Sequence, residues 1–569
     1  MQLPNIWGTG NIFTFSGIDG ECTREKSLIG TLSGDRIGVN FITQNNASLY
    51  IEPYNICDVS YVVVASDIIK GVFTTRTNEK FDFEIMMIAQ NAVYVRIPAC
   101  AKLCVRYSEN PKEKTDGNLT VYDFENEKYA LFKDCKDEYK YYVFSKGENA
   151  EKICYECFTF DINKEVSKKL TYFNDLPIVD GLDKDVEKLY YKAFSNIKGM
   201  VYSPEGMFQR RWTTPDKIPH KDLYLWDSAF HSVALKYISP YLAKEVILAV
   251  FDSQREDGMI AHRSTPEKST DITQPPILAW AVMEIYKYDN DVTFLNDTYD
   301  KLKKYIQWNM ENRDVNNNYL YEWYVNDASI NCRCDESGMD NSPRFDNVTR
   351  MDSIDFSCFM ANEVKILSQM AKILDKSGEH LYWDVIFDRI KKSINDVLYC
   401  KEDGFYYDVL VSDNSFKKVK AVSSFLPLFA GVCEKDVAYK LVDHLKNEFN
   451  TPFAIPSIAT DDETFGTDMW RGPVWINYNY MISEGLKNYG FKKEANEILA
   501  KTISVMKKWY KNDGTIYEFY DSKDEISPSR LNRKGSAVFP YMPKVKMQTI
   551  KDYGWSNTLI AEIILKSIK

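Results

Sequence analysis

The sequence has little histidine, and its cysteines form no framework. Five histidines and 12 cysteines are spread over 569 residues. Cys154 with Cys157, and Cys332 with Cys334, form two short pairs, but neither pair has a histidine or a second pair at a suitable distance. Because structural zinc needs such a ligand set, the sequence predicts no metal site. Scattered cysteines are also typical of reduced thiols in the cytoplasm rather than of disulfides.

Long apolar runs and an excess of basic charge are absent as well. No run reaches the roughly eighteen apolar residues that a membrane-spanning helix requires. Residues 1–5 show no basic segment leading into an apolar stretch, so we expect no signal peptide. The formal net charge of -11 argues against binding to nucleic acid or to an anionic lipid surface. We therefore expect a cytoplasmic protein with neither partner, and the sequence does not indicate its oligomeric state.

Aromatic side chains, by contrast, are abundant. They make up 14% of the residues, with 38 tyrosines and 11 tryptophans. Carbohydrate sites place flat aromatic faces against the C–H faces of sugar rings, so the abundance fits a sugar-binding protein. A large protein also buries many aromatic side chains in its core, and composition alone favours that ordinary explanation.

The hydrophobic pattern divides the chain into two parts. Residues 60–66 are rich in β-branched side chains, and apolar and polar residues alternate in 81–85, 91–97 and 140–144. Such short runs, separated by polar clusters, predict an antiparallel β-sandwich. Near residue 180 the spacing changes to three and four residues, which is typical of helices. We predict a β-sandwich domain over residues 1–175 and an all-α catalytic domain over residues 176–569.

About a dozen helices are predicted in the second part. The clearest segments are 227–236, 242–251, 276–286, 291–308, 354–374, 380–398, 436–447, 473–488, 492–509 and 555–565. Short loops such as 487–491 would join them into αα-hairpins. About six hairpins would close into an (α/α)6 toroid, whereas an open solenoid would show the same periodicity but normally a sequence repeat, which is not visible here.

Long irregular loops interrupt the helical pattern at 204–224, 321–351 and 512–543. Such loops between packed elements are often functional. The segment 223–231 follows the first of them and places Asp227 at the start of a predicted helix, beside Trp226. An aspartate there is usually an N-cap. The adjacent tryptophan, and a preceding loop with Arg210 and Arg211, make Asp227 a candidate site residue as well.

Two further segments combine groups that suit a sugar. In residues 336–346, Asp340, Asn341 and Arg344 supply the planar donors and acceptors that sugar hydroxyls need, although a polar surface loop would look similar. In residues 467–478, Trp470 and Trp475 flank an arginine and a glycine, which burial in a core does not explain. Pro473 in the same segment fits the first turn of a helix.

The last candidate site residue is a glutamate near the C-terminal end of the chain. Asp513-Gly514 is a turn signal, and Glu518 follows it between aromatic residues. Burial among such rings would raise the pKa of its carboxyl, although an exposed glutamate is common and this signal alone is weak. The last unusual segment, 553–558, precedes the final predicted helix, where Ser556 or Asn557 could serve as a cap.

Taken together and in order, these segments resemble the inverting (α/α)6-barrel glycosidases. The closest likeness is to glycoside hydrolase family 63, the processing α-glucosidases with their bacterial relatives, and to the mannosylglycerate hydrolases. The likeness rests on the WDSxFH turn, Thr273-Gln274-Pro275-Pro276, SGxDNSPR, the WRGPxW turn, the late glutamate and GWS, over roughly residues 224–565. Members of this group often carry a β-sandwich before the barrel, but the N-terminal part shows no motif of its own.

The resemblance implies a role for each matched residue. Asp227 corresponds to the general acid and Glu518 to the general base. Binding of the sugar is implied for Trp226, Gln274, Asp340, Asn341, Arg344, Trp470, Arg471 and Trp475. The family usually has an asparagine directly after the base, whereas this chain has Phe519, which leaves Asp521, Asp524 and Glu525 as neighbouring alternatives.

The resemblance therefore predicts an inverting glycoside hydrolase that cleaves α-linked glucosides or related small α-glycosides. Such an enzyme needs neither a metal nor an organic cofactor. Two alternatives remain. A glycoside phosphorylase or another transferase on the same barrel would need a basic phosphate cradle, for which Arg210 with Arg211 is the candidate pair. A non-catalytic carbohydrate-binding protein would lack one of the two carboxyl groups.

Overall fold

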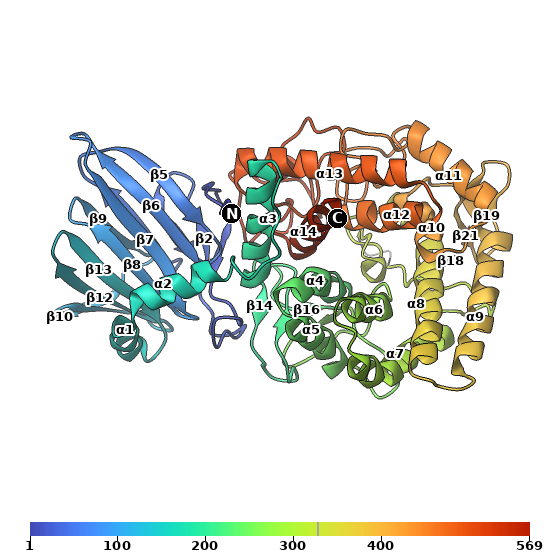
Figure 1. Cartoon of the computed structure of the whole chain (residues 1–569), viewed down its shortest axis with the longest axis horizontal. Helices are drawn as coiled ribbons and strands as arrows, with labels where there is room; N and C mark the ends of the chain where they lie inside the picture. Colours follow the sequence, from blue (N-terminus) through green and yellow to red (C-terminus); the bar gives the residue numbers. More distant parts are fainter. Residues whose placement is uncertain (327–328, 569) are drawn as a thin grey trace.

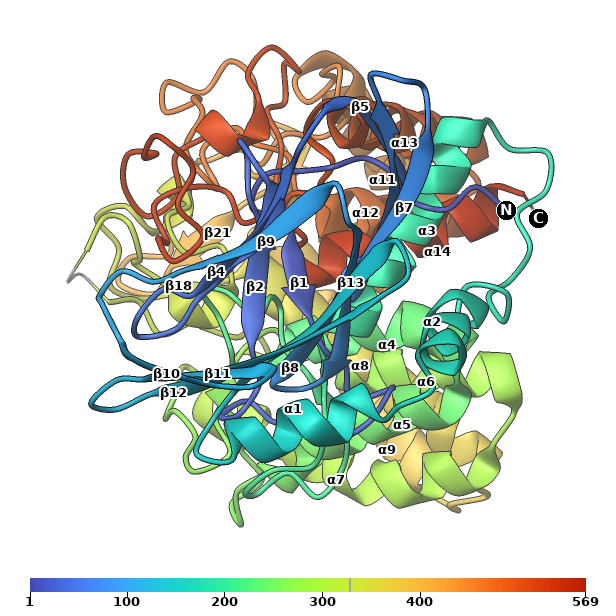
Figure 2. The same ribbon diagram turned by 90° about the vertical axis from the view of Figure 1, so that its left-hand side faces the viewer.

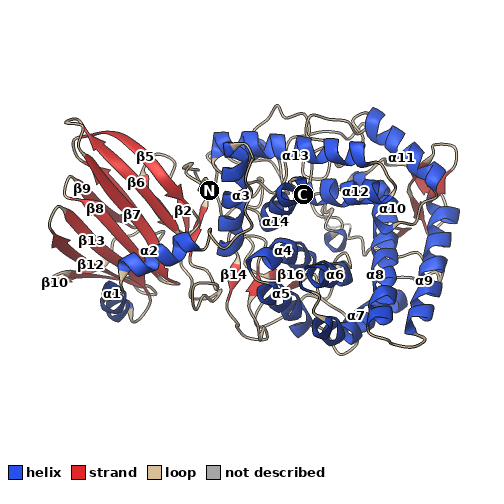
Figure 3. Ribbon diagram, viewed as in Figure 1, coloured by secondary structure: helices blue, strands red, loops and turns tan. Residues whose placement is uncertain are grey.

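Strands come first in the chain and long helices follow, as Figures 1 and 3 show for this computed structural model, which describes residues 1–326 and 329–568. The strands of the first part form two antiparallel sheets. One sheet has the order β1 (Ile12–Thr14), β2 (Ile29–Leu32), β3 (Ile37–Phe41), β4 (Ser48–Pro53), β9 (Ala101–Arg106). The other has the order β10 (Lys112–Asp116), β11 (Leu119–Asp123), β12 (Lys128–Lys136), β13 (Tyr139–Lys146), β8 (Ala92–Pro98), β7 (Lys80–Ala89), β6 (Ile68–Thr75), β5 (Ile56–Val64).

Alternation along the strands gives each sheet one face that packs inward. Phe41 of the first sheet stacks on Phe144 of the second with ring centroids 6.1 Å apart, so the two apolar faces meet. The predicted strands at 60–66, 81–85, 91–97 and 140–144 correspond to β5, β7, β8 and β13. The expectation of antiparallel β-structure ahead of a helical part is therefore confirmed. Figure 2, viewed from the strand side, shows both sheets in front of the helices.

Two short helices after the strands have no counterpart in the sequence prediction. They are α1 (Ala150–Phe158) and α2 (Ile162–Thr171). Helix α1 packs on β12 and β13, where the buried Cys154 thiol lies against the carbonyl oxygen of Val143 at 3.2 Å. All 12 cysteines, including both short pairs, are free thiols. Both helices are short, and their stability depends on tertiary contacts such as those of α1 with the strands, which explains why periodicity did not reveal them.

The second part is built mainly from longer helices, and all of them except α3 and the short α10 agree with predicted segments to within a few residues. They are α3 (Lys184–Gly199), α4 (Leu225–Ile238), α5 (Pro240–Asp252), α6 (Leu278–Asp289), α7 (Val292–Asn312), α8 (Ile354–Ile373), α9 (Glu379–Ser393), α10 (Leu426–Ala430), α11 (Lys435–Asn447), α12 (Ile476–Asn488), α13 (Lys492–Asp513) and α14 (Gly554–Ser567). Pro473 lies ahead of α12 rather than in its first turn. Within the described residues, none of these helices has the length and apolar character needed to cross a membrane.

Helix contacts form a closed cycle. Helix α4 packs against α6, and the contacts continue through α8, α10 and α12 to α14, which packs back against α4. These inner helices are apolar on most sides, as expected for helices surrounded by protein. Helices α3, α5, α7, α9 and α13 lie outside and pack against α14, α4, α6, α8 and α12, respectively. An open solenoid would leave its first and last helices unpaired, so the contacts do not fit that alternative.

A buried ion cluster connects the two parts of the chain. Lys169 of α2 and Lys198 of α3 both contact Asp19 and Asp67, at nitrogen–oxygen distances of 2.7–3.0 Å. The four side chains are at most 6% exposed. Charges removed from water to this degree depend on one another, because losing one partner leaves an uncompensated charge.

We expect Lys169→Met to destabilise the protein, because one of the two ammonium groups that compensate Asp19 and Asp67 is lost. The free energy of unfolding in urea should fall by about 3 kcal/mol. Lys168→Met is the matched control, because Lys168 is exposed on the same helix and bonds only to the carbonyl oxygen of Asp19. Equal stability of the two variants would show that the cluster contributes nothing to the fold.

Candidate active site

A cavity of about 450 Å³ opens in the helical part and is lined by segments far apart in sequence. Strand β16 (Leu223–Tyr224) pairs with β17 (Arg263–Ser264) and brings the start of α4 beside residues 262–274. Val474 pairs with Tyr520, and the backbone nitrogen of Glu518 donates to the carbonyl oxygen of Ile550 at 2.9 Å. These pairings place the loop before α12, the loop after α13 and the start of α14 around one space.

Asp227 lies in the first turn of α4 and faces the cavity. The helix begins at Leu225, with Tyr224 as its N-cap residue, so the ordinary interpretation of Asp227 as the N-cap is wrong. The side chain is only 2% exposed, and burial raises the pKa of its carboxyl well above the usual range. The Tyr553 hydroxyl donates to Oδ1 at 3.2 Å and opposes that rise, while the negative charge of Glu518 adds to it. A carboxyl group whose pKa is raised in this way keeps its proton to a higher pH than an ordinary aspartate does.

Glu518 lines the same cavity, 1% exposed, and is held by a guanidinium. Arg533 Nε donates to Oε2 at 2.7 Å and Nη2 donates to Oε1 at 3.1 Å. A two-pronged pair of this kind fixes both oxygens of a carboxylate. The two cavity carboxyl groups thus have opposite surroundings, with burial for Asp227 and a cation for Glu518. A difference of this kind allows one carboxyl group to act as an acid and the other as a base.

The alternative bases near Glu518 lie elsewhere. Asp521 accepts from the backbone nitrogens of Glu525 and Ile526 and so fixes a turn. Asp524 binds Lys508 and the indole nitrogen of Trp509, both on α13. Glu525 is exposed, and none of these three carboxylates lines the cavity in the described structure.

Aromatic rings form part of the cavity wall. Trp226 meets Trp555 edge to face at 5.1 Å, and Trp475 lies 5.6 Å from Trp555. Gly338 packs against Trp226 with a positive φ of 68°, and a Cβ at that position would lie 2.2 Å from the indole ring. Only glycine allows the loop 332–340 to approach so closely. The Gln274 side chain fixes this wall from behind, because its Oε1 accepts from the Trp226 backbone nitrogen at 3.3 Å.

Of the ten residues singled out by the resemblance, six line the cavity: Trp226, Asp227, Gln274, Asp340, Trp475 and Glu518. Arg344 does not, because its buried guanidinium is bound on both sides by Asp355 and Asp408 at 2.6–2.9 Å. Its expected contact with sugar is corrected to an internal support of the polar loop.

Three further residues also act from behind the wall. Trp470 is fully buried and stacks on Trp475 at 4.0 Å. Asn341 Oδ1 accepts from the Trp470 backbone nitrogen at 3.0 Å, and Arg471 Nε donates to the Asn341 carbonyl oxygen at 2.9 Å. The guanidinium of Arg471 also pairs with Asp346 at 2.7 Å. Asn341, Trp470 and Arg471 therefore join the WRGPxW turn to the polar loop instead of lining the cavity.

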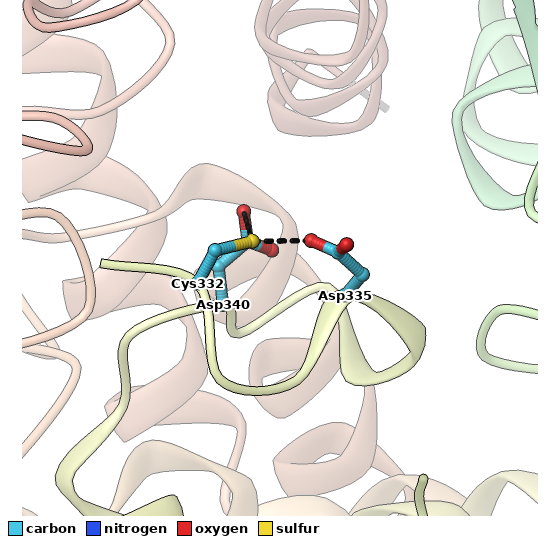
Figure 4. Close-up of side chains that lie close together, drawn as sticks. All are labelled: Cys332, Asp335 and Asp340. Carbon is cyan, nitrogen blue, oxygen red and sulfur yellow. Dashed lines mark hydrogen bonds between the residues drawn. The ribbon is translucent and has the colours of Figure 1, made fainter. Parts of the chain in front are cut away.

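One cluster at the wall has the composition of a metal site. Cys332, Asp335 and Asp340 bring their ligand atoms within 4.8 Å of one another, as Figure 4 shows. The structure supplies a cation from the protein itself, because Lys534 Nζ lies 2.5 Å from Asp340 Oδ2 and 3.2 Å from Cys332 Sγ. An ammonium in this place satisfies the charges that a metal ion would otherwise balance.

The sequence reasoning missed several cavity residues. Tyr553 and Trp555 belong to the segment around GWS, and Arg533 and Lys534 to the long loop 512–543, so both segments had been noted without these side chains. Arg210 and Arg211, the pair offered for phosphate, bind Asp252 and Glu245 outside the cavity. The basic residues that do line it are Arg263, Arg533, Lys534 and Lys546.

Comparison with known proteins assigns the chain to a family. Residues 220–556, which contain every cavity residue except Pro215, match the mannosylglycerate hydrolase MGH1-like glycoside hydrolase domain. The chain belongs to this glycoside hydrolase family. The resemblance to family 63 and the mannosylglycerate hydrolases is thereby confirmed.

Relatives of this family include a mannosylglycerate hydrolase of Thermus thermophilus, 26% identical over 53% of this chain and 90% of the relative. Mannosylglycerate hydrolase MGH2 of Selaginella moellendorffii is also 26% identical, over 53% of this chain and 77% of its own length. An uncharacterized protein of Borreliella burgdorferi is 26% identical over 44% of this chain, and the match spans only about half, 52%, of that relative.

Solved structures extend the likeness in fold. A family 63 mannosylglycerate hydrolase of Thermus thermophilus in complex with glucose aligns with a TM-score of 0.54 at 22% identity, over 66% of this chain and 99% of that one. A bacterial glucoamylase complexed with acarbose aligns with a TM-score of 0.63 at 12% identity, over 100% of this chain and 96% of that one. Because the second alignment includes the strands, the order of sheets followed by helices is a shared architecture.

Proposed function

We propose that this protein is an inverting glycoside hydrolase that cleaves α-linked glucosides or related small α-glycosides. The observation that carries the proposal is the pair Asp227 and Glu518, which lie almost 300 positions apart in sequence and line one cavity. Burial raises the pKa of Asp227 well above its usual range, and Arg533 holds Glu518. General acid and general base in inverting glycosidases have this division of roles.

In the proposed reaction, Asp227 donates its proton to the glycosidic oxygen as the bond to the anomeric carbon breaks. Glu518 accepts a proton from the water that attacks that carbon from the opposite face. The carboxyl groups of such a pair stand about 6.5–9.5 Å apart, which leaves room for the water. The proton accepted by Glu518 and the proton given by Asp227 balance, and exchange with solvent restores both groups.

The substrate proposal is supported by the cavity and by the relatives. A volume of about 450 Å³ is in the range of sites for small molecules and suits a disaccharide-sized compound. Relatives are named mannosylglycerate hydrolase, probable mannosyl-oligosaccharide glucosidase and cytosolic neutral trehalase, and these names support a glycoside as the substrate. Glucose and mannose are both candidates for the sugar that occupies the end of the cavity next to Asp227.

We also propose a finer description of the fold. We assign the helices to an (α/α)6 toroid, supported by the closed cycle of inner helices, and divide the chain at residues 175 and 176. The proposed setting is the cytoplasm, where reducing conditions would keep the 12 cysteines as thiols. A purely carbohydrate-binding role is not favoured, because both carboxyl groups are present and differ in environment.

The configuration of the first product tests the mechanism. An α-linked substrate, found by a screen for reducing-sugar release from α-linked disaccharides and glycosylglycerates, should give the β anomer first when followed by proton NMR. Initial release of the α anomer would mean retention through a covalent intermediate and would contradict the roles given to both carboxyl groups. Running the screen with and without inorganic phosphate separates hydrolysis from phosphorolysis.

The pH dependence of kcat/KM should report Asp227. Because the acid must be protonated, activity should fall as the pH rises through its raised pKa. The Tyr553 hydrogen bond holds that pKa down, so Tyr553→Phe should move the basic limb of the profile to higher pH. Tyr517→Phe is the control, because that hydroxyl binds Asp513 and does not line the cavity. A basic limb that stays in place in Tyr553→Phe would assign it to another group.

A further inference from the structure

Basic side chains line the cavity in addition to the carboxyl groups of Asp227 and Glu518. Four cations line it, Arg263, Arg533, Lys534 and Lys546, although the chain as a whole carries a net charge of -11. The carboxyl groups in the lining are Asp227, Asp335, Asp340 and Glu518, and burial raises the pKa of Asp227 well above its usual range. A basic wall in an acidic protein calls for a specific explanation.

Close ion pairs hold two of these cations. Arg533 is paired with Glu518, and Lys534 lies between Asp340 at 2.5 Å and Asp335 at 3.9 Å. Arg263 has only a distant contact of 3.7 Å with Asp222, which is already bound by Arg24 at 3.0 Å. Within the described residues, Lys546 has no carboxylate at ion-pair distance.

Lys546 and Arg263 both adjoin the reaction site. The Lys546 carbonyl oxygen accepts from Arg533 Nη1 at 3.2 Å, which places Lys546 next to the guanidinium that holds Glu518. Arg263 pairs across the β16–β17 ladder with Tyr224, three residues before Asp227. Burial, and then the charge of Arg263, lower the pKa of His262 to about 4, so this ring adds no charge of its own.

We propose that Lys546 and Arg263 form a subsite for a phosphomonoester on the leaving-group side of the substrate. This inference rests on the proposed function, and it names the substrate class as α-glycosides whose aglycone is phosphorylated. A phosphomonoester carries a charge of about -1.5 to -2 near neutral pH, which matches Lys546 and Arg263 better than a single carboxylate does, because Arg263 shares its one partner, Asp222, with Arg24. Arginine and lysine are also the side chains that bind phosphate oxygens through charge-assisted hydrogen bonds.

The position of this subsite decides which part of the substrate carries the phosphate. Trp226 follows the start of the same helix as Asp227 and packs against Trp555, whereas Arg263 comes from β17 and Lys546 from the loop after Arg533. A phosphate held there remains on the departing alcohol and takes no part in the chemistry. A reaction that glycosylates a phosphorylated alcohol, or a kinase acting on a small glycoside, would supply such a substrate.

Three substrates with one sugar and a three-carbon aglycone test the subsite: the α-glycosyl glycerol 3-phosphate, the α-glycosylglycerate and the neutral α-glycosylglycerol, each as glucoside and mannoside. The phosphorylated member should have a kcat/KM at least about tenfold above the neutral one and also above the carboxylate. Lys546→Gln should lower the ratio of phosphorylated to neutral kcat/KM by about tenfold. Lys544→Gln is the matched control, because this exposed neighbour bonds to Asn46 and does not line the cavity.

Binding of inorganic phosphate, measured by calorimetry, separates this inference from the proposed function. Phosphate should bind the wild-type protein and the Lys544→Gln variant, and about tenfold more weakly to Lys546→Gln. If phosphate binds in this way but none of the glycosides is cleaved, the subsite stands and the proposed function fails. If the carboxylate or neutral substrate is preferred and phosphate does not bind, the subsite fails while hydrolysis stands. Formation of a sugar 1-phosphate would also overturn the subsite, because phosphate would then be the nucleophile.

Discussion

Asp227→Asn should lower kcat by about 10²- to 10⁴-fold on glycosides with sugar or glycerate leaving groups. The amide keeps the shape of the buried side chain and its contact with the Tyr553 hydroxyl, but it has no proton to give to the glycosidic oxygen. Glycosides with good leaving groups, such as aryl glycosides or glycosyl fluorides, need little protonation. Their rates should therefore fall much less, and this difference identifies a general acid.

A control for Asp227→Asn should make the same substitution of aspartate by asparagine at a position close to the cavity. Asp271→Asn is suitable, because its side chain is 98% exposed although the adjacent Thr270 and Ile272 line the cavity. Its rates on both substrate types should equal those of the wild type. A uniform loss on all leaving groups in Asp227→Asn would assign Asp227 a role in binding rather than in proton transfer.

Glu518→Gln should lower kcat by a similar factor, about 10²- to 10⁴-fold, because the attacking water then has no base. Here the loss should be alike for good and poor leaving groups, since activation of the water is needed with both. The amide also leaves Arg533 without its carboxylate partner, so a fold check by circular dichroism belongs with the kinetics.

Glu525→Gln provides the matched control for the base. This glutamate lies seven positions away, is exposed and is absent from the cavity wall. Wild-type rates in Glu525→Gln together with a large loss in Glu518→Gln would locate the base. An unchanged rate in Glu518→Gln would remove the assignment of the base and would favour the phosphorylase alternative, in which no separate base is required.

The sequence predicted the order of strands and helices because both patterns repeat over many residues. Asp227 could be found for a similar reason, because the WDSxFH turn combines a helix start with residues that rarely occur together. The short helices α1, α2 and α10 were missed, since they depend on the surfaces that they cover and have little periodicity of their own.

Polar side chains were harder to assign, because their roles depend on partners distant in sequence. Arg344 has the composition expected of a sugar contact, but Asp408, 64 positions away, holds it inside the protein. Arg533 carries no local signal, and only the fold places its guanidinium against Glu518. A sequence shows which groups are polar, whereas the network that satisfies them is a property of the packed structure.

The closed cycle of inner helices has a consequence for how the protein is made. Helix α14 covers α3 and α4, which are synthesised more than 300 residues earlier. Until α14 leaves the ribosome, the apolar side of α4 that it covers has no partner, and the nascent chain is exposed to aggregation during most of its translation. A premature stop before residue 554 would thus produce a chain that depends on chaperones, and losing one short helix would affect the whole ring.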